Sequence, residues 1–401
     1  MTSSTYDIVT VGGGLGGSAL AKAMAEHGAR VLVLERETHF KDRVRGEGMH
    51  AWGVPEAKAL GIYELLRTTC GQEVRWWDIY LGSQLMAHRD FLTTTPHQSP
   101  LFGFYHPDMQ EVLLTAAAEA GAEVWRGAQV RNVRPGRIPT VEVEDNGQHR
   151  ELHARLVVAA DGRTSPTRQW AGFAVQRDPE RRLFAGVLLE NVPLASDTWY
   201  AVMNPTNGQE VFLGNVGRGW VRAYLGYPKD AHRRFQTTAD IPRLIDESLR
   251  TGAAADLYAH ARAVGPLASF GSDDSWVEHP YKDGVALVGD AASTCDPSFG
   301  QGLAMTLRSV RLLRDQLLKT KDWGAAGHAY AEEQHRNFRV IHTLEDWLRS
   351  MFLETGPEAD ARRVKALPLM AQDGTRLPDL FGMGPDAPIS NTIKRRFLGE
   401  E

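Results

Sequence analysis

The sequence predicts an α/β protein with a doubly wound parallel sheet, an inserted antiparallel sheet and a set of C-terminal helices. Three observations predict this class. Residues 8–11 form an apolar run that passes through a glycine-rich turn into an alanine-rich segment. Two further apolar runs, at residues 156–160 and 285–288, each lead into an aspartate beside a glycine. Residues 183–225 instead look like four short strands separated by turn residues, which is typical of an antiparallel meander.

The composition is that of an ordinary globular protein. The chain has 401 residues, enough for one large domain or two closely joined ones, with 42% hydrophobic and 24% charged residues. Its net charge of −5 and pI near 6.3 give no reason to expect a nucleic-acid partner. No apolar run approaches the roughly 18 residues of a membrane span, and the first strand leaves no room for a signal peptide. We therefore expect a cytoplasmic protein without a membrane span.

The cysteines and histidines give no case for a metal site. The chain has two cysteines, Cys70 and Cys295, and neither a CxxC nor an HExxH pattern. Two cysteines in a chain of this length do not make a disulfide framework. We expect Cys295 to be a small buried thiol.

The glycine-rich turn at residues 12–17 has the pattern GxGxxG between an expected strand and an expected helix. Gly12 permits the tight turn, Gly14 lets the backbone approach a pyrophosphate, and Gly17 lets helix and strand pack closely. The second expected strand ends at Glu35, which is placed to accept hydrogen bonds from ribose hydroxyls. A carboxylate here would repel the 2′-phosphate of NADP. The pattern therefore predicts a site for FAD or NAD.

The elements after this unit can be predicted in order. Arg43 and Arg45 alternate in a basic loop, so an extended backbone would point both the same way, either onto a phosphate or into solvent. The sequence then predicts a helix at 54–67, strands within 74–92, a helix at 109–119, a strand at 123–125 and a hairpin within 141–152. After the meander it predicts a helix at 241–250, a strand at 276–280, helices at 303–319 and 325–352, and a tail from residue 357 that either covers the pocket or meets a partner.

The second and third apolar runs carry further candidate binding residues. Asp161 and Gly162 follow the second run, at the strand end where open α/β sheets bind ligands, although a simple turn would also account for them. Asp290 follows the third run. The free N–H groups of Gly302 and Leu303, at the start of the next helix, could cradle an electron-rich group.

These three signals, in this order, resemble the para-hydroxybenzoate hydroxylase type of flavoprotein monooxygenase over about residues 5–320. The resemblance implies a Rossmann-like FAD-binding fold of the GR2 type with an inserted antiparallel-sheet substrate domain. It divides the chain into an FAD-binding domain (1–72, 107–180 and 281–320), a substrate domain (73–106 and 181–280) and C-terminal helices with a tail (321–401).

The resemblance also implies which residues hold the cofactor. The glycine turn and Glu35 would bind the ADP half of FAD, and Asp290 its ribitol chain. Pro297 and the amides of residues 300–303 would lie beside the flavin ring. Arg43 and Arg45 would contact FAD and help to receive NAD(P)H. The full set of expected cofactor-binding residues is Gly12, Gly14, Leu15, Gly16, Gly17, Glu35, Arg36, Arg43, Arg45, Gln110, Val130, Asp161, Gly162, Asp290, Pro297, Gly300, Gln301, Gly302 and Leu303.

The chemistry implied by the resemblance belongs to the cofactor. NADPH or NADH reduces the flavin, molecular oxygen adds at its C4a carbon, and the hydroperoxide hydroxylates an aromatic, phenol-like or secondary-metabolite substrate. Phosphate pairing by Arg43 and Arg45 slightly favours NADPH. No catalytic residue can be named. Six candidates for the substrate pocket, any of which could instead be a core residue, are His50, Trp52, Tyr80, Tyr200, Phe212 and Tyr224.

Other functions stay open on the same scaffold. A reductase of isoprenoid-type double bonds would use FAD without needing oxygen. A flavin-dependent halogenase would need a Trp-x-Trp-x-Ile-Pro motif, where this chain has Trp276-Val-Glu-His-Pro280. A flavin-binding protein without turnover is disfavoured by the intact Asp290, Gly300 and Gly302. The sequence is compatible with a monomer or a homodimer.

Overall fold

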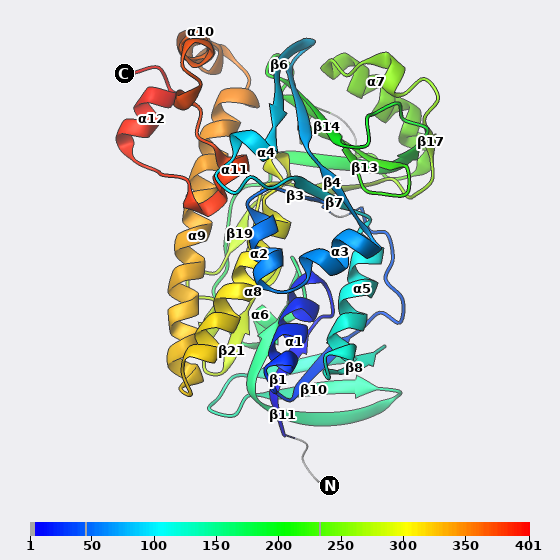
Figure 1. Ribbon diagram of the computed structural model, residues 1–401, viewed down its shortest axis with the longest axis vertical. Helices are drawn as coiled ribbons and strands as arrows, with labels where there is room; N and C mark the ends of the chain where they lie inside the picture. Colours follow the sequence, from blue (N-terminus) through cyan, green and yellow to red (C-terminus); the bar gives the residue numbers. More distant parts are fainter. Residues whose placement is uncertain (1–4, 45, 232–233) are drawn as a thin grey trace.

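The chain folds around two large sheets, one in the lower half and one in the upper half of the view in Figure 1. The computed structural model describes residues 5–44, 46–231 and 234–401. Each sheet takes strands from distant parts of the sequence, so the chain passes between the two halves several times. The doubly wound α/β class with an inserted antiparallel sheet and C-terminal helices is confirmed.

The lower sheet is mainly parallel and carries the three apolar runs. In spatial order its strands are β20 (Tyr281–Lys282), β21 (Val285–Leu287), β11 (Gln148–Ala159), β1 (Thr5–Val11), β2 (Val31–Glu35) and β8 (Glu123–Arg126). The neighbouring strands from β21 to β8 pair in parallel. In addition, β10 (Thr140–Asp145) pairs antiparallel with the first half of β11, and β9 (Gln129–Arg134) pairs antiparallel with β10. All five residues of β2 are buried, as expected for a strand covered on both faces.

Helices close the lower sheet and form the largest apolar cluster with it. Helix α1 (Leu15–Glu26) packs on α5 (His106–Glu119) and on α8 (Gly302–Lys319), and the long α9 (Trp323–Phe352) lies along α8. The inner face of α1 is built from small residues such as Ala19 and Ala23, so its neighbours approach closely. Apolar residues of α9, among them Ile341, Leu344 and Leu348, lie in this core.

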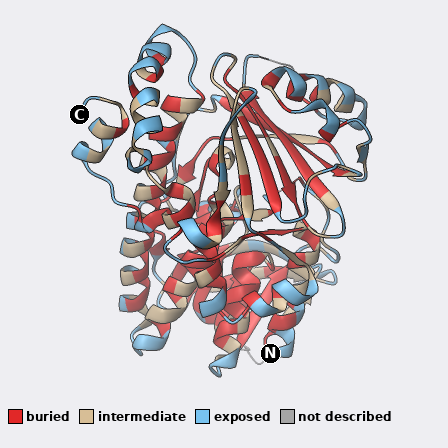
Figure 2. Cartoon of the chain, turned by 45° about the horizontal axis from the view of Figure 1, so that its top comes forward, coloured by how far each residue is buried: buried red, intermediate tan, exposed pale blue. Residues whose placement is uncertain are grey.

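The upper sheet is antiparallel except for one pair. Its strands, in spatial order, are β17 (Arg262–Ala263), β13 (Arg182–Glu190), β16 (Trp220–Pro228), β15 (Gln209–Asn215), β14 (Thr198–Asn204), β5 (Trp76–Leu81) and β6 (Gln84–Asp90), with β18 (Ala268–Gly271) also on β13. The parallel pair is β5 with β14. Figure 2 shows that the central strands of this sheet, β13 to β16, are largely buried, whereas β6 at its edge is mostly exposed.

The two faces of the upper sheet differ because side chains alternate along each strand. One face, which includes Val211, Val221 and Leu225, packs on α7 (Ile241–Thr251) through Leu244. The other face carries the intervening residues and is turned toward the lower half of the molecule. This inner face forms one wall of the cavity described below.

Shorter elements connect the halves. Two small sheets are formed by β3 (Gly48–Met49), β7 (Leu101–Phe104) and β4 (Gly71–Val74), and by β12 (Gln176–Arg177), β19 (Ser275–Trp276) and β22 (Ser293–Thr294). Helices α4 (Phe91–Thr94) and α6 (Pro166–Trp170) are single turns.

Three segments differ from the sequence-based expectation. The helix predicted at 54–67 is two helices, α2 (Gly53–Ala59) and α3 (Tyr63–Thr69), because Gly61 adopts a φ of +66° between them. The strand predicted at 276–280 is only the end of β19. The tail from residue 357 contains α10 (Pro357–Gln372), α11 (Leu380–Met383) and α12 (Asn391–Phe397), and Asp379 and Ser390 cap the last two through their side chains.

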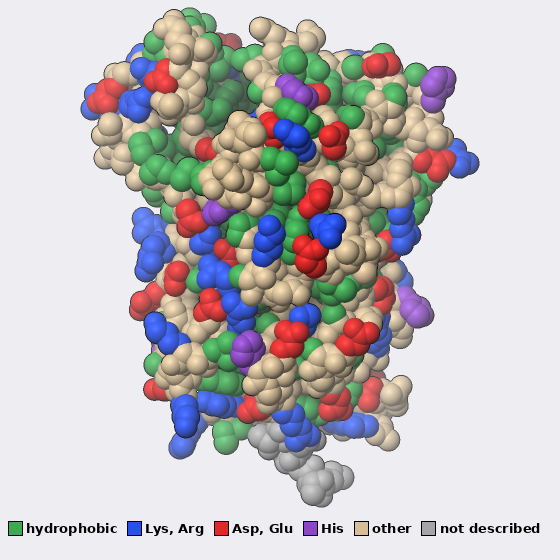
Figure 3. Space-filling view, in the orientation of Figure 1, with side chains coloured by type: hydrophobic (Ala, Val, Ile, Leu, Met, Phe, Trp, Pro, Cys, Tyr) green, Lys and Arg blue, Asp and Glu red, His purple; other side chains and the backbone are tan. Residues whose placement is uncertain are grey.

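The visible surface carries charges of both signs. In Figure 3, Lys and Arg side chains alternate with Asp and Glu side chains over the face shown. The described side chains on this face therefore form no positive stripe of the kind that binds nucleic acid. Within the described ranges, every helix is too short or too polar to cross a bilayer.

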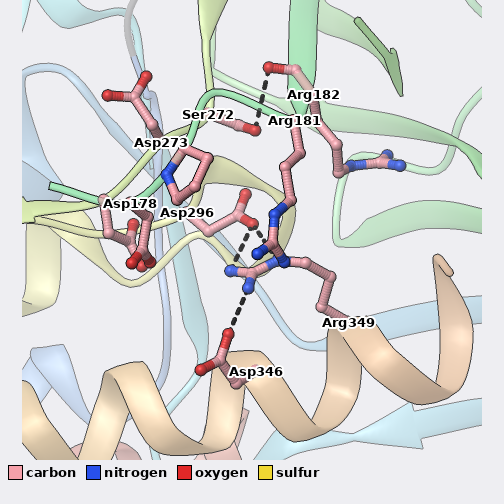
Figure 4. Close-up of a pocket in the computed structure, with 10 residues that line it drawn as sticks. Asp178, Arg181, Arg182, Ser272, Asp273, Asp296, Asp346 and Arg349 are labelled. Carbon is pink, nitrogen blue, oxygen red and sulfur yellow. Dashed lines mark hydrogen bonds and ion pairs between the residues drawn. The ribbon is translucent and has the colours of Figure 1, made fainter.

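A buried ionic cluster joins α9 to the segment after β22. Figure 4 shows Arg349 of α9 between Asp346 and Asp296, at the edge of a cavity of about 130 Å³. The Arg349 Nε atom donates to Asp296 Oδ2 at 3.0 Å. Glu345, on the same helix, is fully buried and accepts the Asp296 amide at 3.4 Å. Burial, together with Asp274 and Asp296, raises the pKa of the Glu345 carboxyl well above its usual range.

We expect Glu345→Gln to stabilise the protein at neutral and alkaline pH. Because the folded-state pKa of Glu345 is raised, the folded chain holds its proton more tightly than the unfolded chain, and stability falls as pH rises above about 4.3. Glutamine keeps the oxygen that accepts the Asp296 amide and cannot ionise. Its advantage in melting temperature should grow from none near pH 5 to on the order of 2 °C at pH 8.

Thermal scans across this pH range, with the exposed Glu332→Gln on the same helix as control, provide the check. A melting-temperature difference between Glu345→Gln and the natural chain that does not change with pH would contradict this account of the cluster.

Candidate active site

A cavity of about 830 Å³ lies between the two halves of the molecule. Its lining comes from the glycine turn, the carboxyl ends of β2, β11 and β21, residues 297–303, and the inner face of the upper sheet. The volume is in the range of sites that take a cofactor or a small ligand. The carboxyl ends of parallel strands meet here, as the sequence predicts for this fold.

The glycine turn is held by two close approaches of backbone. Gly12 has a φ of +101°, and a Cβ atom on it would lie 2.5 Å from the carbonyl oxygen of Ala160. A Cβ on Gly17 would lie 1.9 Å from the carbonyl oxygen of Gly12. Both residues must therefore be glycine for β1, β11 and α1 to meet.

Gly14 is different, because its surroundings are open. A Cβ atom here would meet only the Gln110 Nε2 atom, at 3.5 Å, which is an ordinary contact. Gly14 is the N-cap of α1 and no side chain caps this helix. The first N–H groups of α1, at Leu15 and Gly16, lie at the cavity wall and can receive an anionic group.

Glu35 is fixed at the end of β2. Its Oε2 atom accepts the Gly13 amide at 2.7 Å, and its Oε1 atom accepts the Glu37 amide at 2.8 Å. An ionised carboxylate has further acceptor capacity, so ribose hydroxyls can still bind. Arg43 lines the cavity and pairs with Glu37. Arg45, its predicted companion, lies outside the described residues.

The Asp161 carboxylate, just after the end of β11, accepts two hydrogen bonds from the start of α6. Its Oδ1 atom accepts the Ser165 hydroxyl at 2.5 Å, and its Oδ2 atom accepts the Thr167 amide at 3.1 Å. The carboxylate therefore holds the start of α6, and the backbone of Asp161 and Gly162 forms the cavity wall. Gly162 has a φ of +79°.

The third motif places a helix start and an acid on the same wall. Asp290 follows β21 and lines the cavity, as do Pro297, Gly300, Gly302 and Leu303. Helix α8 begins at Gly302 without a side-chain cap. Its N-terminal amides lie at the cavity wall, and the positive end of its dipole can stabilise negative charge there.

Most of the predicted cofactor residues surround this one cavity. Those that line it are Gly12, Gly14, Leu15, Gly16, Glu35, Arg36, Arg43, Gln110, Val130, Asp161, Gly162, Asp290, Pro297, Gly300, Gly302 and Leu303. Two do not. Gly17 lies inside the turn, against Gly12, and the Gln301 side chain points away to accept the Trp52 indole N–H at 2.8 Å.

Of the six residues predicted for the substrate pocket, three line the cavity and three do not. His50, Phe212 and Tyr224 line the cavity. Trp52 is fully buried against Gln301. Tyr80 and Tyr200 form a ring pair, with centroids 4.9 Å apart, in the cluster on the α7 side of the upper sheet.

Tyr80 and Tyr200 lie on the α7 face of the sheet and not on the cavity face, because successive side chains of a strand alternate between its two faces. On β5 and β14, the residues that lie an odd number of positions away from these tyrosines face the cavity instead. Trp77 and Trp199 line the cavity, with centroids 6.3 Å apart, and were missed. The register of the two strands, Trp77 opposite Trp199, was the signal that the sequence could not supply.

His50 holds the turn that precedes α8. One ring nitrogen, Nε2, lies 2.9 Å from the carbonyl oxygen of Phe299 and must donate to it. Burial lowers the pKa of His50 to about 4, so the ring is neutral at physiological pH. His50 also packs on Phe381 of α11, at a centroid distance of 5.1 Å. Arg89 clamps this part of the tail through two hydrogen bonds of 2.8 Å to Asp379.

A buried ion pair joins the basic loop to the upper sheet. Arg222 of β16 is 1% exposed and donates to Glu47 Oε2 at 2.6 Å and to Asp42 Oδ2 at 2.8 Å. Glu47 also accepts the His106 amide at 3.0 Å. The loop that carries Arg43 is thereby attached to the inner face of the sheet.

Comparison with known proteins agrees with this geometry. A family model described as an FAD binding domain matches residues 5–336. The rifampicin monooxygenase of Streptomyces venezuelae is 28% identical over 370 residues, which are 90% of this chain and 75% of that protein. Digeranylgeranylglycerophospholipid reductase 2 of Methanopyrus kandleri is 30% identical over 326 residues, 77% of this chain and 75% of that protein.

Among solved structures, the p-nitrophenol 4-monooxygenase of Pseudomonas putida shares the fold. The TM-score is 0.81 at 18% identity, covering 96% of this chain and 100% of that one. The family match spans most of the chain, including all three motifs at the cavity wall. The chain therefore belongs to the FAD-binding-domain family and is a flavoprotein oxidoreductase of the para-hydroxybenzoate hydroxylase type, with FAD as its cofactor.

Proposed function

We propose that the protein is an NAD(P)H-consuming monooxygenase that hydroxylates an aromatic or secondary-metabolite substrate. The observation that carries this proposal is the continuity of the cavity. It runs from the glycine turn, past residues 297–303, to aromatic side chains on the inner face of the upper sheet. A redox cofactor and an aromatic ring therefore have adjoining places in one continuous cavity.

The residues present fit FAD along the length of this cavity. The pyrophosphate would lie on the first N–H groups of α1, where Gly14 leaves space. Glu35 would bind the adenosine ribose, and Asp290 the ribitol chain. The flavin ring would lie beside Pro297 and the amides of residues 300–303, where the α8 dipole stabilises negative charge.

When bound and reduced by NAD(P)H, FAD supplies the activation of O2, one atom of which enters the substrate while the other leaves as water. The protein itself holds the cofactor and the substrate in position and shields the reacting ring from water. The aromatic inner face excludes water from the reacting ring, and His50 fixes the turn beside it through Phe299. Arg43 lines the cavity, where its guanidinium would bind the reductant.

A reductase of isoprenoid-type double bonds is the second candidate, since several curated relatives are named as digeranylgeranylglycerophospholipid reductases. Such a substrate offers neither donors nor acceptors along its chain. The upper end of this cavity includes the carboxylates of Glu47 and Glu210 among its aromatic rings. This polarity favours an aromatic substrate with polar substituents.

The placement of FAD predicts opposite effects for two glycine variants. Gly14→Ala should fold with an unchanged apoprotein melting temperature, because its Cβ atom makes only an ordinary contact. It should lower FAD affinity by on the order of tenfold, since the methyl group occupies the pyrophosphate position. Gly17→Ala should unfold at lower temperature, because its Cβ atom collides with the Gly12 carbonyl.

Flavin-to-protein ratios and FAD titrations of the apoproteins measure these effects. Full FAD affinity in Gly14→Ala would rule out a pyrophosphate at the start of α1.

The proposed reaction can be tested by mixing the holoenzyme with NADH or NADPH without oxygen, with and without a panel of phenols, and then admitting oxygen. We expect one class of aromatic to accelerate flavin reduction, and oxygen uptake to match the hydroxylated product formed. Anaerobic addition of two hydrogens to an isoprenoid substrate, with no aromatic product under oxygen, would establish the reductase instead.

A further inference from the structure

We propose that Glu210 is the carboxylate that receives the substrate: its free oxygen accepts a hydrogen bond from a ring hydroxyl and takes that proton during hydroxylation. The inference rests on the proposed function and adds to it a catalytic residue and a substrate class, a phenol without a carboxylate group.

Glu210 is a buried acid on the inner face of the upper sheet. It lies in β15, and its side chain is 8% exposed and lines the large cavity. Its Oε1 atom accepts a hydrogen bond from Arg182 Nη2 at 2.8 Å. Within the described chain, no hydrogen bond reaches its other oxygen, Oε2, and the Ser298 hydroxyl close to this carboxylate is itself without a hydrogen-bond partner. A carboxylate with one oxygen fixed and the other free at a cavity wall is prepared for a ligand that donates.

The position of Glu210 relative to the turn before α8 suits this role. Burial raises the pKa of Glu210, as does Asp296, whereas Arg182 and the Ser298 hydroxyl lower it. Ser298 lies in the 3₁₀ turn Pro297–Phe299, beside which we place the flavin ring. The Glu210 carboxylate is thus held near the part of the cavity where oxygen would be delivered. Its raised proton affinity suits the acceptance of a proton.

The surroundings of Glu210 are shaped for an aromatic ring. Gly226 lies opposite Glu210 on β16, and a Cβ atom there would lie 2.5 Å from Glu210 Oε1 and 2.8 Å from the ring of Phe184. The next cross-strand pair on the same face of the sheet is Phe212 with Tyr224, whose centroids are 6.4 Å apart. Phe184 packs on Tyr224, also at 6.4 Å. The Glu210 carboxylate therefore lies at the edge of an aromatic patch.

The charges here favour a neutral hydroxyl donor. Arg182 already balances the charge of Glu210, so the pair does not need a cationic ligand. Glu47, at the same end of the cavity, is likewise paired with Arg222. A substrate carboxylate would meet two acids and no free described cation on this face. We therefore expect phenols to be preferred over hydroxybenzoates.

The proton transfer fits the balance of the reaction. The phenol O–H bond breaks and its proton passes to Glu210 Oε2, which leaves electron density on the ring oxygen. A ring carbon ortho or para to it forms a C–O bond to an atom from O2 and then loses its own proton as the ring becomes aromatic again. NAD(P)H supplies the two electrons, and the second oxygen atom leaves as water.

The test compares Glu210→Gln with the natural holoenzyme on a phenol and on its methyl ether, which cannot donate a proton. The natural enzyme should hydroxylate the phenol faster, and Glu210→Gln should lose on the order of 100-fold in that rate. NAD(P)H oxidation should continue, with hydrogen peroxide replacing product. The preference for the phenol over the ether, measured both by rate and by equilibrium binding, should collapse in the variant.

Two further variants separate a catalytic role from a structural one. Glu210→Asp keeps the carboxylate and should retain the preference for the phenol even if its rate falls. Glu278→Gln, an exposed acid outside the cavity lining, should behave as the natural enzyme. An unchanged preference in Glu210→Gln with normal flavin content would overturn the role of Glu210 while leaving the proposed function standing. Absence of oxygen insertion in the natural enzyme would instead count against the proposed function.

Discussion

The structure depends on the close approach of three backbone segments at the glycine turn. Gly12 lies against the carbonyl of Ala160, and Gly17 lies against the carbonyl of Gly12, with no room for a Cβ atom at either place. This contact aligns the start of α1 with the carboxyl ends of β1, β2 and β11. Free amides, a fixed acid and a second helix start then meet along one wall, and the cofactor site follows from that alignment.

The upper sheet completes the site because its two faces are chemically different. One face is covered by α7, and the other presents Phe184, Phe212 and Tyr224 to the cavity together with the Glu210 carboxylate. The buried pair of Arg222 with Glu47 connects this face to the loop below it. Such a pair adds little net stability, but it fixes how the loop sits on the sheet.

The sequence predicted the parts of the site that are set by local spacing. The glycine turn, Asp161 and the segment from Asp290 to Leu303 depend on short patterns, and the FAD family follows from their order. Inward-facing residues depend on strand register and sheet pairing. Tyr200 was chosen where its neighbour Trp199 faces the cavity, because β14 pairs with β5, more than a hundred residues earlier. Glu210 could not be predicted as a site residue for a similar reason, because an acidic residue in a strand is usually exposed to solvent.

The central claim is that the cofactor and an aromatic substrate share one cavity in which oxygen is transferred to the ring. Turnover under ¹⁸O2 in ordinary water, followed by mass spectrometry of the product, tests it most directly. The account predicts one ¹⁸O atom in each hydroxylated product molecule. A product that carries oxygen only from water, or that gains two hydrogens and no oxygen, would contradict it.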